Sequence, residues 1–208
     1  MILKKPDYIM IEIRRYIFFK ILKWKIIGDT NFPRKCIVIA APHTHWIDFF
    51  LAIFARSLFV QKNISFIGKK ELFKFPLNYF LKWLGGIPVD RGSHSNSVDS
   101  IAEIFNKKET FILGISPEGT RKKVEKWKTG FYYIAKKTNI PVVSAALDFE
   151  NKQILISNPY HLTNNIEQDI INLKAFFNGI KGKVPKYSWL IHIMKNVLNI
   201  IIFLNFFN

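Results

Sequence analysis

The sequence predicts a single α/β domain with a mixed, mainly parallel sheet flanked by helices. Short apolar segments alternate with longer segments of helical periodicity, and two of the apolar segments end in polar turns. A chain of 208 residues is long enough for one substantial core and short for two. We therefore expect residues 1–208 to form one domain, with its functional motifs in a core over residues 36–149.

Residues 1–30 contain the first expected element, an amphipathic helix over residues 8–27. Aromatic and β-branched residues are mixed there with lysine and arginine, a composition typical of a helix that lies in a membrane interface. An ordinary surface helix that covers the core is an equal alternative. No secretory signal is expected, because charged residues interrupt each apolar run.

The elements of the core follow from the two hydrophobic periodicities and from the glycine and proline residues between them. The expected extended segments are residues 36–41, 64–68, 87–92, 111–115, 140–147 and 153–156. The expected helices are residues 46–60, 69–83, 98–107, 130–137 and 164–177. We expect the second of these helices to continue past Pro76, and residues 93–97 to form a polar loop.

Residues 188–207 form an apolar C-terminal segment with helical periodicity. His192, Lys195, Asn196 and Asn199 interrupt it, and polar groups are costly in hydrocarbon. We therefore expect an interfacial or core-docked helix rather than a bilayer span.

The composition is both basic and apolar, with a net charge of +16, 49% hydrophobic residues and 15% aromatic residues. Anionic lipid and nucleic acid are the usual partners of such a surface. No nucleic-acid-binding motif is present and the aromatic residues cluster in apolar runs, so we expect a phospholipid surface and no nucleic acid. The one cysteine, Cys36, supports neither a disulfide framework nor a thiolate metal cluster. These features favour a peripheral or monotopic protein on the cytoplasmic face of a membrane.

The most informative turn follows the strand expected at residues 36–41. It contains His43, and Asp48 follows five residues later in the expected first turn of a helix. Polar side chains at the carboxyl edge of a sheet are the usual site-forming groups of α/β proteins. We expect His43 to act as a general base and Asp48 to accept a hydrogen bond from its ring.

A second polar turn, residues 116–121, follows the strand expected at residues 111–115 and contains Glu118 and Arg121. Another arginine, Arg91, ends the extended segment at residues 87–92. A guanidinium offers a fixed fork of donors that can bind a phosphate at two points. We expect these turns to meet the histidine turn at one edge of the sheet.

Four blocks, residues 43–48, 87–92, 116–121 and 140–143, resemble in order and spacing those of the glycerolipid acyltransferases, the 1-acylglycerol-3-phosphate acyltransferase superfamily. The first block matches the His-x4-Asp motif and the third contains Glu-Gly-Thr-Arg. Pro42 stands where many members have asparagine, and Ser116 stands where an aromatic residue is frequent. These departures leave the identity of the acceptor open.

The resemblance implies transfer of an acyl group from acyl-CoA or acyl carrier protein to a lysophospholipid, by default 1-acylglycerol-3-phosphate, giving phosphatidate. It implies direct catalysis by His43 and Asp48 without a cofactor beyond the acyl-thioester donor. The residues that it places at the substrates are Lys69, Arg91, Glu118, Gly119, Thr120 and Arg121.

Three other interpretations use the same residues. His43 and Asp48 could be a structural pair at a helix start, since aspartate is common there. With His45, they could begin the site of a metal-dependent hydrolase, although no second ligand cluster of familiar spacing follows. The chain could also be a lipid-surface binding module without catalytic activity.

Overall fold

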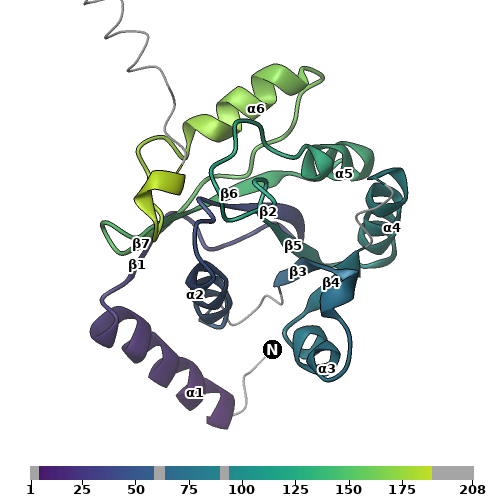
Figure 1. The fold of residues 1–208 in the computed structure, drawn as a ribbon. Helices are drawn as coiled ribbons and strands as arrows, with labels where there is room; N and C mark the ends of the chain where they lie inside the picture. The colour runs from purple at the N-terminus through teal and green to yellow at the C-terminus, as the bar shows by residue number, and fades with distance from the viewer. Residues whose placement is uncertain (1–4, 59–63, 90–93, 189–208) are drawn as a thin grey trace, which may run out of the picture.

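The computed structural model describes residues 5–58, 64–89 and 94–188, which form an α/β domain around one seven-stranded sheet (Figure 1). The strand order is β1-β7-β6-β2-β5-β3-β4. Every neighbouring pair is parallel except β6 and β7, which are antiparallel. The predicted class, a mixed and mainly parallel sheet flanked by helices, is confirmed.

The strands agree with the expected extended segments to within a few residues, apart from β1. Their bounds are β1 Lys25–Ile27, β2 Lys35–Ala41, β3 Ile64–Lys69, β4 Gly86–Val89, β5 Phe111–Ile115, β6 Val142–Asp148 and β7 Gln153–Ile156. Since parallel neighbours run in the same direction, the loops that follow β2 and β5 leave the sheet at the same edge.

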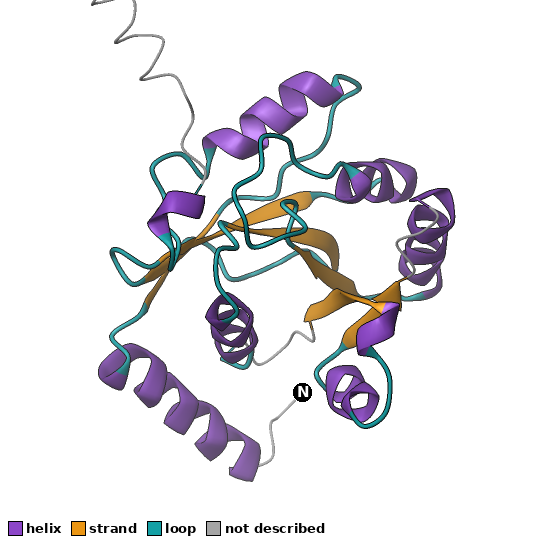
Figure 2. Ribbon diagram, in the orientation of Figure 1, coloured by secondary structure: helices purple, strands orange, loops and turns teal. Residues whose placement is uncertain are grey.

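The helices cover both sides of this sheet. Their bounds are α1 Lys5–Tyr16, α2 Ile47–Arg56, α3 Leu77–Trp83, α4 His94–Lys107, α5 Gly130–Thr138 and α6 Ile166–Ala175. Figure 2 shows α1, α2 and α3 on one side of the sheet and α4, α5 and α6 on the other. The sheet is therefore buried between two helical layers.

Strand β2 lies at the centre of the sheet, and its sequence is an apolar run without polar alternation. Cys36 and Val38 pack with residues of α2, whereas Ile37 and Ile39 pack with residues of α4, α5 and α6. Both faces of the strand are buried, so both sets of alternating side chains are apolar.

The helix predicted over residues 8–27 is wrong in its C-terminal part. Helix α1 ends at Tyr16, a π-helical turn follows over Ile17–Ile21, and Lys25–Ile27 is strand β1, paired with β7. Lys23 adopts a left-handed conformation with a φ of 57°, and the chain reverses there from helix to strand. A strand of three residues is too short to produce a visible periodicity.

The predicted continuous helix over residues 69–83 is also wrong. A 3₁₀ turn, Lys70–Leu72, is followed by a break, and α3 begins directly after Pro76. Proline has no backbone N–H to donate and is favoured at helix starts, so it separates the two pieces. The helix predicted over residues 46–60 ends at Arg56 as α2.

The polar loop predicted over residues 93–97 is wrong, because α4 begins at His94. Serine and asparagine are tolerated in the first turn of a helix, where they reduce the apolar signal without breaking the helix. The helix predicted over residues 188–207 lies outside the described residues except for Ser188. Within the three described ranges, none of the helices has both the length and the apolarity to cross a bilayer.

The N-terminal segment is attached to the core through Phe18, which is fully buried and packs against Trp24 and Phe54. Several apolar side chains of α1 remain exposed on its other side, namely Ile9, Met10, Ile13 and Tyr16. The segment therefore combines a core-docked turn with an exposed apolar helix face.

Truncation of Phe18 tests this docking. Phe18→Ala should lower the free energy of unfolding by about 3–5 kcal/mol, the usual cost of removing a buried phenylalanine side chain. Ile21, which is 61% exposed in the same turn, gives the matched control Ile21→Ala, with an expected loss under about 1 kcal/mol. Chemical denaturation measures both, and equal losses would show that the N-terminal segment does not pack as described.

Candidate active site

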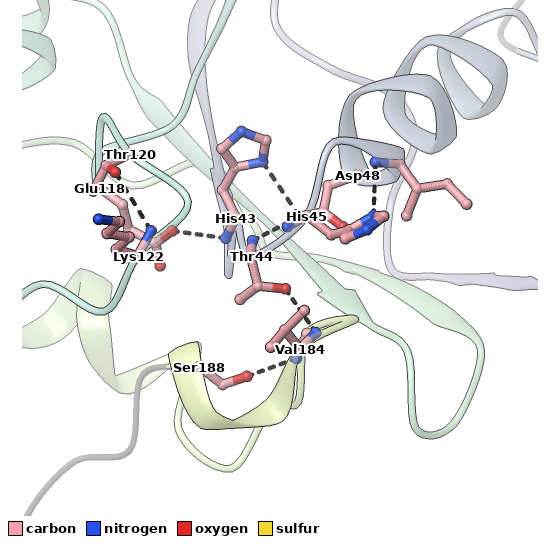
Figure 3. Close-up of polar contacts among 11 residues, drawn as sticks. His43, Thr44, His45, Asp48, Glu118, Thr120, Lys122, Val184 and Ser188 are labelled. Atoms are coloured by element: carbon pink, nitrogen blue, oxygen red, sulfur yellow. Dashed lines mark hydrogen bonds and ion pairs between the residues drawn. The ribbon is translucent and has the colours of Figure 1, made fainter.

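His43 lies in the connection between β2, which ends at Ala41, and α2, which begins at Ile47. Glu118 lies in the loop after β5, the parallel neighbour of β2, with Ile39 and Ile115 in register. The two loops therefore leave the sheet side by side, and the close-up shows Glu118 beside His43 (Figure 3).

Asp48 links the histidine ring to the start of α2. Its Oδ2 accepts hydrogen bonds from the backbone N–H groups of Thr44 and His45, both at 2.7 Å, and lies 3.3 Å from Nδ1 of His43. Asp48 is almost fully buried, whereas the side chain of His43 is 23% exposed. With Nδ1 directed at the carboxylate, the other ring nitrogen, Nε2, is left for contact with a substrate.

Glu118 holds the backbone of the same histidine. Its Oε2 accepts a 2.7 Å hydrogen bond from the backbone N–H of His43, and the residue is buried. The pKa of Glu118 is raised from 4.5 to about 7, chiefly by burial; the hydrogen bond from His43 opposes this rise, and the negative charge of Asp48 adds to it. Two carboxyl groups from different elements thus fix His43, Asp48 of α2 at its ring and Glu118 of the loop after β5 at its backbone.

A third contact to this turn comes from the C-terminal end of the described chain. Oγ1 of the buried Thr44 accepts a 3.0 Å hydrogen bond from the backbone N–H of Val184. A Cβ atom on Gly182 would lie 2.7 Å from that same Oγ1, so only glycine fits there without a shift. No motif in the sequence indicates this contact, and the sequence analysis missed it.

His45 has a local role in the turn. Its Nδ1 accepts a 3.2 Å hydrogen bond from the backbone N–H of Ile47, and its own backbone N–H binds Asp48. Across the part of the chain that the structure describes, no group of three or more histidine, cysteine, aspartate or glutamate side chains could hold a metal ion.

The loop over residues 116–121 is shaped by Gly119, whose φ of 63° lies in the left-handed region. A Cβ atom there would lie 2.8 Å from the side chain of Lys128, which packs over the glycine. Lys128 is held by a 2.8 Å hydrogen bond from its backbone N–H to the carbonyl oxygen of Pro117. Exposed Arg121 ends this loop and exposed Lys122 follows it, so at least three cations, with Lys128, border the loop.

An open cavity of about 1870 Å³ connects these residues. Six of the predicted site residues line it, namely His43, Asp48, Lys69, Gly119, Thr120 and Arg121. Lys128 also lines it, and apolar side chains of α2 and β3, among them Phe49, Ile53 and Phe66, form another part of its wall. Arg91 lies outside the described residues.

The raised pKa of Glu118 predicts a pH-dependent stability. The folded chain holds this proton more tightly than the unfolded chain, so stability falls as the pH rises from about 4.5 to about 7. Glu118→Gln keeps an oxygen that can accept the His43 hydrogen bond and removes the titration. Relative to this variant, the wild type should lose about 3 kcal/mol of unfolding free energy over that range.

Denaturation at several pH values measures this difference. Glu125→Gln, at an exposed glutamate of the following loop, is the matched control and should follow the wild-type profile. A constant difference between wild type and Glu118→Gln across the range would contradict the burial of an ionisable Glu118.

The part of the chain that contains these residues is similar in sequence to known proteins. A family model described as "Acyltransferase" matches residues 23–148, more than half of the chain. A coconut (Cocos nucifera) 1-acyl-sn-glycerol-3-phosphate acyltransferase is 31% identical over 127 residues, which cover 58% of this chain and 40% of that protein. A Saccharomyces cerevisiae protein of the same name is 26% identical over 148 residues, 67% of this chain and 47% of that protein.

This chain thus spans less than half the length of either relative. No solved structure matches it significantly. The family model covers the strands and loops that position His43, Asp48 and Glu118. The chain therefore belongs to the acyltransferase family, as its resemblance to the glycerolipid acyltransferases indicates.

Proposed function

We propose that this protein transfers a fatty acyl group from a thioester donor, acyl-CoA or acyl carrier protein, to the hydroxyl of a lysophospholipid. The default acceptor is 1-acylglycerol-3-phosphate, which would give phosphatidate, and the names of the two relatives support this choice. The observation that carries the proposal is the His43 ring, which faces the Asp48 carboxylate through Nδ1 and borders the cavity.

In the proposed reaction, Nε2 of His43 removes the proton of the acceptor hydroxyl as its oxygen attacks the thioester carbonyl carbon. The tetrahedral adduct then collapses, the carbon–sulfur bond breaks, and the imidazolium returns its proton to the departing sulfur. Asp48 stabilises the imidazolium and keeps the ring in one tautomer. No acyl-enzyme forms, and general base catalysis of this kind contributes about 10²- to 10⁴-fold.

The size of the cavity supports two substrates bound together. Its 1870 Å³ exceeds the roughly 300–1,000 Å³ typical of a pocket for one small ligand. The apolar wall formed by α2 and β3 is suited to an acyl chain, and the polar loop with Arg121 and Lys128 is suited to a phosphate. Arg91 remains a predicted phosphate ligand, and Glu118, Gly119 and Thr120 remain predicted to shape the acceptor site.

The site of action proposed here is the cytoplasmic face of a membrane, with the protein peripheral or monotopic. The net charge of +16 and the exposed apolar face of α1 support contact with an anionic lipid surface. Residues 1–208 are proposed to act as one domain.

An acyl-transfer assay tests the proposal directly. The purified protein is incubated with a labelled long-chain acyl-CoA and lysophosphatidate, and diacyl product and free thiol are measured with and without a chelator. Equal amounts of both products, unaffected by the chelator, are expected. Free thiol without diacyl product, or loss of activity to the chelator, would favour a hydrolase.

Replacement of each histidine separates the proposed base from its neighbour. His43→Ala should lower kcat by about 10²- to 10⁴-fold, because no base then takes the hydroxyl proton. His45→Ala is the matched control, because its ring accepts only a local backbone hydrogen bond, and kcat should change by less than about threefold. Steady-state kinetics measure both, and comparable inactivation would favour the metal-dependent alternative.

Replacement of Arg121 tests the proposed phosphate site. Arg121→Ala should raise the KM for lysophosphatidate by about 10- to 100-fold, through loss of charge-assisted hydrogen bonds, with little effect on the acyl-CoA KM. Arg34→Ala, at an exposed arginine just before β2 and so at the opposite edge of the sheet, should change neither value. An increase confined to the donor KM would place Arg121 at the donor.

A further inference from the structure

The segment from the last residue of β3 to the end of α3, residues 69–83, presents large apolar side chains to solvent; we name it the α3 arm. Phe75 and Trp83 are 83% and 79% exposed, and α3 buries none of its residues. The other exposed apolar side chains of the arm are Leu72, Leu77, Tyr79 and Phe80. Soluble surfaces rarely gather so many such side chains in one short segment unless they bind a partner.

The arm is nevertheless firmly attached to the sheet. The Phe73 ring lies against two glycines of adjacent strands, since a Cβ atom on Gly68 or Gly86 would come within 2.7 Å and 2.9 Å of it. The chain is also held on either side of the arm, where the guanidinium of Arg56 donates hydrogen bonds to the carbonyl oxygens of Ile64 and Leu84, at 2.5 Å and 2.7 Å. The exposed side chains therefore belong to a segment that packs on the sheet, and they face solvent.

The charges around these side chains identify the kind of partner. Four lysines, Lys69, Lys70, Lys74 and Lys82, are spread along the arm, and its one acidic residue is Glu71. Tryptophan and tyrosine prefer the boundary between headgroups and hydrocarbon, and nearby lysines are attracted by anionic headgroups. A second copy docked face to face would bring its own lysines against these, which disfavours a symmetric dimer.

The arm also borders the cavity. Lys69, Leu72, Phe73 and Leu81 belong both to the arm and to the cavity lining. Figure 1 shows α3 on the same side of the sheet as α2, whose residues form the apolar wall, and as α1 with its exposed apolar face. A lipid surface in contact with the arm would thus lie next to an entrance to the cavity.

We propose that the α3 arm docks the protein on an anionic bilayer, with Phe75 and Trp83 inserted at the headgroup boundary and the lysines on the headgroups. Lipid binding by the arm stands independently of the reaction. Direct entry of a lysophospholipid from the bilayer into the cavity rests on the proposed function.

Vesicle co-sedimentation in the absence of substrate tests the docking. The vesicles contain phosphatidylcholine, with or without phosphatidylglycerol as the anionic lipid. Wild-type protein should bind the anionic vesicles, and added salt should weaken that binding. Phe75→Ser and Trp83→Ser should each lower the partition coefficient by about tenfold, and the double variant by about a hundredfold.

Ile171→Ser is the matched control, since Ile171 is 58% exposed on α6, on the other side of the sheet. It should leave vesicle binding unchanged. Circular dichroism should show folded protein for all variants, because both arm residues are exposed. Undiminished binding by the double variant, or equal loss in the control, would overturn the proposal.

Fluorescence quenching by brominated phosphatidylcholine, mixed into the anionic vesicles, tests the depth of insertion without a destabilising change. Quenching should fall in Trp83→Phe, which keeps an aromatic ring for binding and removes the fluorophore. Unchanged quenching in this variant would overturn the proposal, as would a lipid-free dimer that Trp83→Ser dissociates in sedimentation velocity. Acyl transfer is judged by its own assay, so failure of docking and failure of the reaction are distinguishable.

Discussion

The contact between the Asp48 carboxylate and the His43 ring determines the geometry of the whole site. One oxygen of Asp48 accepts hydrogen bonds from two backbone N–H groups of the turn and also faces Nδ1 of the ring. The start of α2 and the orientation of the imidazole are therefore fixed together. Glu118, in the loop after β5, accepts a hydrogen bond from the backbone N–H of His43. The Glu118 contact depends on the parallel pairing of β2 and β5, which aligns the ends of the two strands. The register of β2 and β5 thus places Glu118 beside His43 without a long loop.

This arrangement has an electrostatic cost. Glu118 is buried near the negative charge of Asp48, and its raised pKa shows that its ionised form is disfavoured there. Groups with perturbed pKa values concentrate at functional sites, where position matters more than stability. The hydrogen bond from the backbone N–H of His43 offsets part of the cost, so the His43 turn and the buried acid stabilise one another.

Local signals in the sequence explain which features could be predicted. Each polar turn directly follows the end of a strand, and His43 and Asp48 are five residues apart at the start of a helix. These features could be predicted because each is local in the sequence. The Thr44–Val184 hydrogen bond joins residues 140 positions apart and is made by a backbone group, so no side-chain pattern marks it. Strand β1 is too short for a periodicity, and the break before α3 depends on how the chain turns at Pro76. The exposure of the α3 arm was missed for a related reason, because apolar residues at helical spacing predict burial unless the tertiary structure is known.

The proposed mechanism depends most on the tautomer of His43, which is open to direct measurement. Nitrogen-15 NMR of histidine-labelled protein, with the His43 resonances assigned by their loss in His43→Gln, distinguishes a protonated Nδ1 from a protonated Nε2. The proposed mechanism predicts that neutral His43 carries its proton on Nδ1, and that Asp48→Asn weakens this preference. A neutral His43 protonated mainly on Nε2 in the wild type would contradict it, because the nitrogen that borders the cavity could not then act as the base.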